Sequence, residues 1–119
     1  IVVWDDFCTG SRYFEGTVDP EGNPLNSIGQ RYFNRIICPA KHRECFSRGD
    51  SLLKMVENTR AQGVIFVILK FCDPHAFDFP YIKELLDRAG IPSMLLEIED
   101  QQTSLEQLKT RIEAFIELL

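Results

Sequence analysis

Three side chains that can do chemistry follow one apolar segment of this sequence. The segment is residues 64–69, and Cys72, Asp73 and His75 come shortly after it. It is apolar without alternation and rich in β-branched and aromatic residues, which is typical of a strand covered on both faces in a parallel sheet. Ligands of open α/β sheets bind beyond the carboxyl ends of such strands. We therefore predict that Cys72 carries the chemistry; the alternative is a cysteine of the core, with Asp73 capping a turn and His75 bonding to loop backbone.

The other three cysteines give weaker indications of a site. Cys8 follows the apolar residues Ile1–Trp4, and it either lies past the end of a strand or fills a core position. Cys38, His42 and Cys45 offer thiols and an imidazole to zinc, but a structural zinc site needs four ligands and the spacing fits no paired-knuckle pattern. Because the chain is not a small, cysteine-dense secreted protein, we expect reduced thiols in the cytoplasm.

A local excess of positive charge stands out on an acidic chain. The formal net charge is −5, yet residues 31–48 contain one acidic residue, Glu44, against these basic ones: Arg31, Arg35, Lys41, Arg43 and Arg48. Such a stretch can meet the phosphates of a ligand or an acidic partner, and a solvated loop is the alternative. The overall negative charge argues against nucleic-acid binding. No apolar run approaches the roughly 20 residues of a membrane span, so we expect no membrane association.

Strand and helix patterns alternate along the chain. The predicted strands are Ile1–Trp4, residues 64–71 and Met94–Ile98. The first predicted helix runs from Asn23-Pro24 to residue 38, and the second covers residues 51–62, with Asp50 as its cap and Gly63 at its end. The third covers residues 80–89, with Pro80 in its first turn and Gly90 past its end. A capping box of Thr103 and Glu106 starts the last helix. This alternation predicts an α/β fold of three layers, in which a parallel sheet carries helices on both faces. We expect residues 1–119 to be one domain of a longer protein, since the chain starts without Met inside an apolar run.

Four segments, spread over nearly the whole length of the chain, together match the sequence pattern of a known protein family. They are residues 5–14 (DDFCTGSRYF), Cys38-Pro39 with His42 nearby, residues 70–75 (KFCDPH) and residues 110–115 (TRIEAF). Together they resemble the carboxyl-terminal part of the 2-hydroxyacyl-CoA dehydratase family, of the 2-hydroxyglutaryl-CoA dehydratase D-component type. This family also includes benzoyl-CoA reductase subunits.

The resemblance implies a cofactor and partners. Family enzymes pair two related subunits, and each holds a [4Fe–4S] cluster through three cysteines, of which the third lies in the Lys-Phe-Cys motif, here Cys72. The other two belong to an earlier domain, so the isolated chain should hold no cluster and be inactive. Asp73 and His75 would then lie next to the cluster ligand Cys72 without binding iron themselves. An ATP-dependent iron–sulfur activator supplies one electron, and the CoA thioester becomes a ketyl radical that loses water. The basic stretch would contact CoA or the partner subunit.

Three functions are consistent with these residues. The first is the carboxyl-terminal domain of a cytoplasmic (R)-2-hydroxyacyl-CoA dehydratase subunit, a lyase of anaerobic amino-acid fermentation. The second is a benzoyl-CoA reductase-type subunit, which reduces a ring. The third is a non-enzymatic α/β module that binds a phosphate-bearing ligand, for which a glycine-rich turn directly after a strand would be the expected signal. The acyl group and the identity of the subunit stay open.

Overall fold

The computed structural model describes residues 1–34, 38, 47–99 and 104–119. The chain divides into two compact units, Ile1–Arg48 and Gly49–Leu119. That residues 1–119 form a single carboxyl-terminal domain stays a prediction. No helix in the described part of the chain combines the length and the apolar character needed to cross a membrane.

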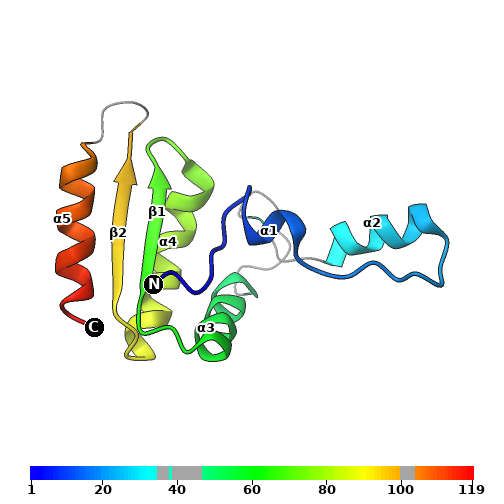
Figure 1. The fold of residues 1–119 in the computed structure, drawn as a ribbon, viewed down its shortest axis with the longest axis horizontal. Coiled ribbons are helices and arrows are strands. Elements are labelled where there is room, and N and C mark those ends of the chain that lie inside the picture. The colour runs from blue at the N-terminus through cyan, green and yellow to red at the C-terminus, as the bar shows by residue number, and fades with distance from the viewer. Residues whose placement is uncertain (35–37, 39–46, 100–103) are drawn as a thin grey trace. The chain divides into compact units, whose positions relative to one another are not determined.

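The second unit is built on a parallel pair of strands. Strand β1 (Val64–Leu69) pairs with β2 (Ser93–Ile98), so that Val64 lies opposite Ser93 and Leu69 opposite Ile98. The two strands run side by side in the same direction in Figure 1. The apolar run thus forms the predicted strand, and the α/β class is confirmed.

Helices pack against this pair through apolar contacts, and an arginine side chain donates to a backbone carbonyl of β2. Helix α4 (Asp73–Arg88) contacts both strands, and its Phe79 meets Phe66 of β1 edge to face at 5.0 Å between ring centroids. In helix α5 (Leu105–Ile116), the guanidinium of Arg111 donates to the carbonyl of Leu95 at 2.8 Å. The buried apolar residues are Val56, Ile68, Ile82, Leu86, Leu96 and Phe115. The three-layer arrangement with helices on both faces stays a prediction.

The first unit contains two helices, α1 (Ser11–Phe14) and α2 (Pro24–Asn34). The α2 helix starts as predicted. Asn23 Oδ1 accepts hydrogen bonds from the backbone N–H groups of Leu25 at 3.1 Å and Asn26 at 3.2 Å, and these are two of the donors that a helix start leaves unpaired. The predicted end at residue 38 cannot be compared with the structure, since residues 35–37 lie outside the described part.

The prediction of a strand at Ile1–Trp4 is wrong. The segment has no strand conformation, and the sheet found within the described residues has two strands, β1 and β2. All four side chains of the segment are exposed. Apolar, β-branched residues favour a strand, but a strand forms only where its N–H and C=O groups pair with a neighbour.

Helix α3 (Ser47–Thr59) differs from its prediction at both ends. It starts before Asp50 and includes Gly49. Glycine is required at this position, because side-chain atoms of Leu85 in α4 occupy the place where a Cβ of residue 49 would lie. It ends before the residue expected to end it: the left-handed conformation falls on Arg60, with φ of 53°. Gly63 is instead required for close packing, since a Cβ there would lie 2.9 Å from the ring of Phe115.

Helix α4 starts at Asp73, seven residues before the predicted position, so the predicted start of this helix at residue 80 is wrong. Pro74 fits the first turn, where a missing N–H removes no helix bond. Pro80 lies inside the helix, although a proline there removes one bond. Gly90 follows the helix in the left-handed conformation, with φ of 70°, as predicted.

Helix α5 begins after Ser104, whose side chain makes no capping hydrogen bond. The predicted capping box used Thr103, which lies outside the described residues. Along the helix, Phe115 is buried, whereas Leu105 and Ile116 are exposed.

Candidate functional site

Cys72 leaves the carboxyl end of β1 in a tight turn. This segment, Leu69–Cys72, is called here the Cys72 turn. The N–H of Cys72 donates to the carbonyl of Leu69 at 3.0 Å, which closes a four-residue turn, and the carbonyl of Cys72 accepts from the N–H of Ala76 at 3.0 Å. Cys72 is thus the residue at the amino-terminal cap of α4, with its thiol not used as a cap. A half-buried thiol, free of any disulfide, stands where the sequence predicted it.

The third residue of the Cys72 turn has an unusual backbone. Phe71 has φ of 67°, the left-handed region that bulky residues avoid. A positive φ at the third position is the mark of a type II turn, where glycine or asparagine is ordinarily found. The side chain of Phe71 is 93% exposed, so packing against the described residues does not hold it there.

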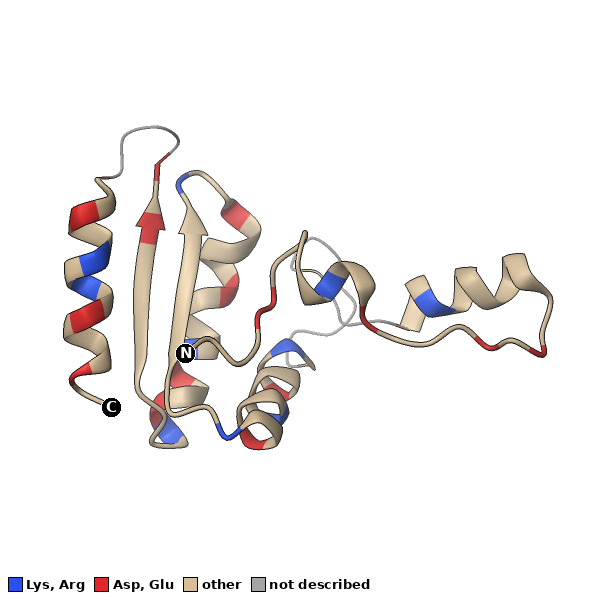
Figure 2. Cartoon of the chain, in the orientation of Figure 1, with Lys and Arg blue, Asp and Glu red and all other residues tan. Residues whose placement is uncertain are grey.

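Charged and polar groups adjoin the Cys72 turn. Lys70 Nζ lies 2.8 Å from Glu99 Oε2, which ties the turn to the residue after β2, and charges mark the ends of both strands in Figure 2. This bond, together with attraction to Glu99, raises the pKa of Lys70 above its ordinary value. Asp73, the first residue of α4, is exposed, and His75 is half-buried. Both lie in the first turn of α4, whereas the sequence predicted them before a helix that starts at residue 80.

The donors of the described residues do not complete a metal site. No group of three or more His, Cys, Asp or Glu side chains in the described part of the chain is placed to hold a metal ion. A half-buried cysteine at the positive end of a 16-residue helix suits an anionic iron–thiolate bond. It can therefore serve as one ligand of a cluster whose other ligands come from elsewhere. Cys38 is free, and His42 and Cys45 of the weak zinc pattern lie outside the described residues.

The first unit contains a second cysteine turn, residues 5–12, called here the Cys8 turn. Its carboxylate Asp5 accepts from the N–H of Phe7 at 3.1 Å, from the N–H of Ser11 at 3.0 Å and from the Ser11 hydroxyl at 3.1 Å. These bonds, above all the two from backbone N–H groups, lower the pKa of Asp5 below its ordinary value. Gly10 is required beside it, because the Asp5 carboxylate occupies the place of a Cβ at residue 10.

Arg12 fills the centre of the Cys8 turn. Its side chain is 2% exposed and binds the Asp6 carboxylate by two bonds, from Nε at 2.9 Å and from Nη2 at 2.7 Å, and it also donates to the backbone carbonyl of Asp6. Nη1 of Arg12 lies 3.4 Å from Cys8 Sγ, and Arg48 reaches the same Asp6 carboxylate at 3.2 Å. Burial works against the charge of Arg12, but bonding and attraction to Asp6 outweigh it and raise the pKa of Arg12 above its ordinary value. The thiol of Cys8 is exposed.

The basic stretch is described at two of its five positions. Arg31 donates to the backbone carbonyls of Gly16 and Tyr13, each at 3.2 Å, and Arg48 binds Asp6. Both guanidinium groups therefore bind within the first unit. Arg35, Lys41 and Arg43 lie outside the described residues, and a role of this stretch toward CoA or a partner stays a prediction.

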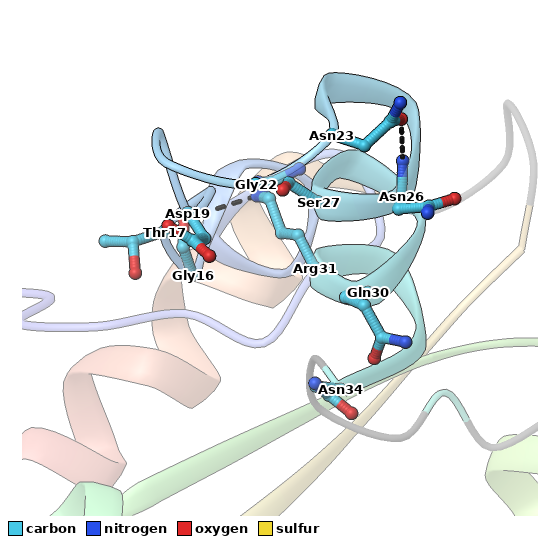
Figure 3. A pocket seen from close by; sticks show the side chains of 10 residues that line it. All are labelled: Gly16, Thr17, Asp19, Gly22, Asn23, Asn26, Ser27, Gln30, Arg31 and Asn34. Carbon is cyan, nitrogen blue, oxygen red and sulfur yellow. Dashed lines mark hydrogen bonds between the residues drawn. The ribbon is translucent and has the colours of Figure 1, made fainter.

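A shallow hollow of about 480 Å³ lies beside α2, and Figure 3 shows the side chains that line it. Its lining is polar and includes Asp19, Asn23, Asn26, Gln30 and Arg31. Of the cysteines that the structure describes, none lines this hollow.

Two residues of these turns were not predicted as important by themselves. Arg12 was part of the DDFCTGSRYF segment, and its spacing of six residues from Asp6 was the available signal. Phe71 had no signal, because a left-handed turn residue is expected from glycine or asparagine and not from phenylalanine.

Comparison with known proteins gives a match over the whole chain. The family described as 2-hydroxyglutaryl-CoA dehydratase, D-component, matches residues 1–119. The chain is 36% identical over 119 residues to the (R)-phenyllactyl-CoA dehydratase beta subunit of Clostridium sporogenes, with 99% of this chain and 31% of that protein covered. It is 30% identical over 119 residues to the lactoyl-CoA dehydratase subunit beta of Anaerotignum propionicum, with 99% of this chain and 32% of that protein covered.

A more distant relative is named for a different activity. The chain is 22% identical over 116 residues to a benzoyl-CoA reductase subunit of Thauera aromatica, with 96% of this chain and 30% of that protein covered. The chain thus spans about a third of the length of these curated relatives.

Proposed function

Because the chain belongs to the 2-hydroxyglutaryl-CoA dehydratase D-component family, we propose that it is the carboxyl-terminal part of an (R)-2-hydroxyacyl-CoA dehydratase subunit. The two relatives with higher identity are named as beta subunits of such dehydratases. The full-length subunit would act as a lyase in the cytoplasm, together with a related second subunit and an ATP-dependent iron–sulfur activator. The isolated chain would be inactive.

The observation that carries this proposal is the position of Cys72. Its thiol is free, half-buried and at the cap of α4, past the carboxyl end of β1. In the full-length subunit it would be one of three cysteine ligands of a [4Fe–4S] cluster, with the other two outside residues 1–119. A cluster bound there supplies the one-electron exchange that elimination of water from a 2-hydroxyacyl-CoA requires.

The residues of this chain would then bind, orient and shield. The turn from Leu69 to Cys72 fixes where the thiol lies, since both its ends are tied by backbone bonds to β1 and α4. Asp73 and His75 would set hydrogen bonding and water access around the ligand. The CoA phosphates would meet basic residues of the 31–48 stretch, above all those outside the described residues, because Arg31 and Arg48 bind internally.

The test compares two cysteine variants of the full-length subunit. Cys72→Ser should lose the cluster, whereas Cys8→Ser should keep it, because Cys8 contacts Arg12 in a turn that needs no metal. Iron and acid-labile sulfide analysis with electron paramagnetic resonance on anaerobic samples gives the answer. If Cys72→Ser retains a normal cluster and full turnover, the proposed role of Cys72 is wrong.

A reductase-type function is the second candidate. It is favoured by the match to a benzoyl-CoA reductase subunit over 96% of this chain, but at 22% identity against 36% for the dehydratase relative. Turnover of the complete enzyme with (R)-2-hydroxyacyl-CoA and with benzoyl-CoA distinguishes the two functions.

A further inference from the structure

The backbone of Phe71 is costly and nothing within the described residues offsets the cost. A left-handed φ of 67° strains the backbone of a bulky residue. An exposed aromatic ring adds no packing energy in return, and this ring is 93% exposed. Glycine would occupy the same position of the turn without strain. The phenylalanine therefore does not serve the stability of the turn.

The exposed ring of Phe71 can instead act on the neighbouring residue, Cys72. Phe71 directly precedes Cys72, and both leave β1 in one closed turn. On the other side of the thiol the first residues of α4 are Asp73 and Pro74, of which Asp73 is exposed and charged. Among the large apolar side chains of this turn, that of Phe71 is therefore the nearest in sequence to the thiol of Cys72. Lys70, its other neighbour, is bound to Glu99.

We propose that Phe71 is a positioning residue that shields from solvent the metal group bound by Cys72. This inference rests on the proposed function, since it requires a cluster at Cys72. Solvent access and the apolar surroundings of an iron–sulfur cluster control its potential and its stability toward oxidants. The strain at Phe71 is then retained because a large apolar side chain is needed at this position of the turn, and glycine has none.

The experiment uses the full-length subunit with its cluster, prepared without oxygen. The measurement is the rate at which the visible absorbance of the cluster is lost in air. Phe71→Ala keeps the strain and removes the ring, and it should raise this rate about ten-fold, as is common for residues around a metal ligand. Phe71→Leu keeps an apolar cover and should restore a rate close to that of the unchanged protein. Phe77→Ala is the matched control, because that ring is also exposed, at 84%, and should have no effect.

A second measurement separates shielding from folding. Phe71→Gly should raise the melting temperature, because it relieves the strain, while the cluster bleaches faster. A ring with a merely structural role would give the opposite change in melting temperature, and that result would overturn the inference. The inference would also be overturned if the cluster of Phe71→Ala bleaches at the unchanged rate while Cys72→Ser lacks the cluster. In that case the proposed function would still hold. If Cys72→Ser keeps its cluster, the proposed function fails, and the shielding role fails with it.

Discussion

The two cysteine turns of this chain are built in opposite ways. In the Cys8 turn the carboxylates of Asp5 and Asp6 and the guanidinium of Arg12 are all bonded within the turn or to Arg48. In the Cys72 turn one residue carries backbone strain, its ring is exposed and the thiol makes no capping bond. A turn that satisfies its own groups serves the fold, whereas a turn with an uncompensated cost points to a function that lies outside it.

The same comparison explains why the sequence alone placed both cysteines past the end of a strand, although only Cys72 was predicted to carry chemistry. Each follows an apolar segment, so each was placed at the carboxyl end of a strand. The structure separates them, since Cys72 follows a strand that pairs with β2, while Ile1–Trp4 has no such pairing. The difference between the turns depends on hydrogen bonds and on one dihedral angle, which the residue types do not reveal.

The largest effect on stability is expected from replacing Arg12, the residue at the centre of the Cys8 turn. Arg12→Ala should lower the free energy of unfolding by about 3 kcal/mol, because it leaves the Asp6 carboxylate, 27% exposed, without its main partner. Chemical denaturation of the protein measures the loss. Arg88→Ala is the matched control, since Arg88 and Glu84 form an exposed pair and should change stability by less than about 0.5 kcal/mol. Equal effects of the two variants would show that the buried arginine is not the centre of the turn.

The fold could be predicted where residue types alone determine local structure. The apolar run of β1, the Asn23-Pro24 start of α2 and the Gly90 end of α4 each depend on neighbours in sequence, and the structure has them all. The role of Gly49 in α3 was missed because the contact that requires a glycine there comes from Leu85 of α4, which is distant in sequence. The long α4 was missed because the cost of Pro80 is offset by the packing of the helix on the strands.

The candidate site was predicted only as far as Cys72 and its two neighbours. Their position past β1 follows from the run of apolar residues, and the family resemblance named Cys72 as a ligand. Phe71 belongs to the KFCDPH motif, but its residue type indicates no role, since a phenylalanine in a left-handed turn contradicts the usual preference for glycine. Such a contradiction between residue and backbone becomes visible only in the structure.

The second prediction concerns glycine, whose removal from the Cys8 turn should have the opposite effect on stability to its introduction in the Cys72 turn. Gly10→Ala should lower the free energy of unfolding by about 1–2 kcal/mol, because the new Cβ displaces the Asp5 carboxylate from its bonds to backbone N–H groups. This is the reverse of the gain expected for Phe71→Gly. Gly29→Ala is the control: a Cβ at Gly29 meets no atom within 4 Å, and alanine favours the interior of α2. A stable Gly10→Ala protein with unchanged exchange of the Ser11 amide would contradict the close approach of Asp5.

The smallest effect concerns pH and separates the turns by their carboxylates. The pKa of Asp5 is lower in the folded protein than in the unfolded chain, because backbone N–H groups of Phe7 and Ser11 bind its charged form. Its contribution to stability is therefore complete at neutral pH, starts to fall as the pH approaches the unfolded value near 3.8, and is lost as the pH falls through the folded value.

Asp5→Asn should remove this part of the acid sensitivity and reduce stability at neutral pH by about 1 kcal/mol, since the amide accepts weaker bonds than the carboxylate. Urea denaturation of both proteins between about pH 7 and pH 3 measures the difference. The two curves should converge as the pH falls, because the protonated carboxyl of Asp5 and the amide that replaces it in the variant are both uncharged. Curves that stay parallel over the whole range would mean that the Asp5 carboxylate does not hold the Cys8 turn through its charge.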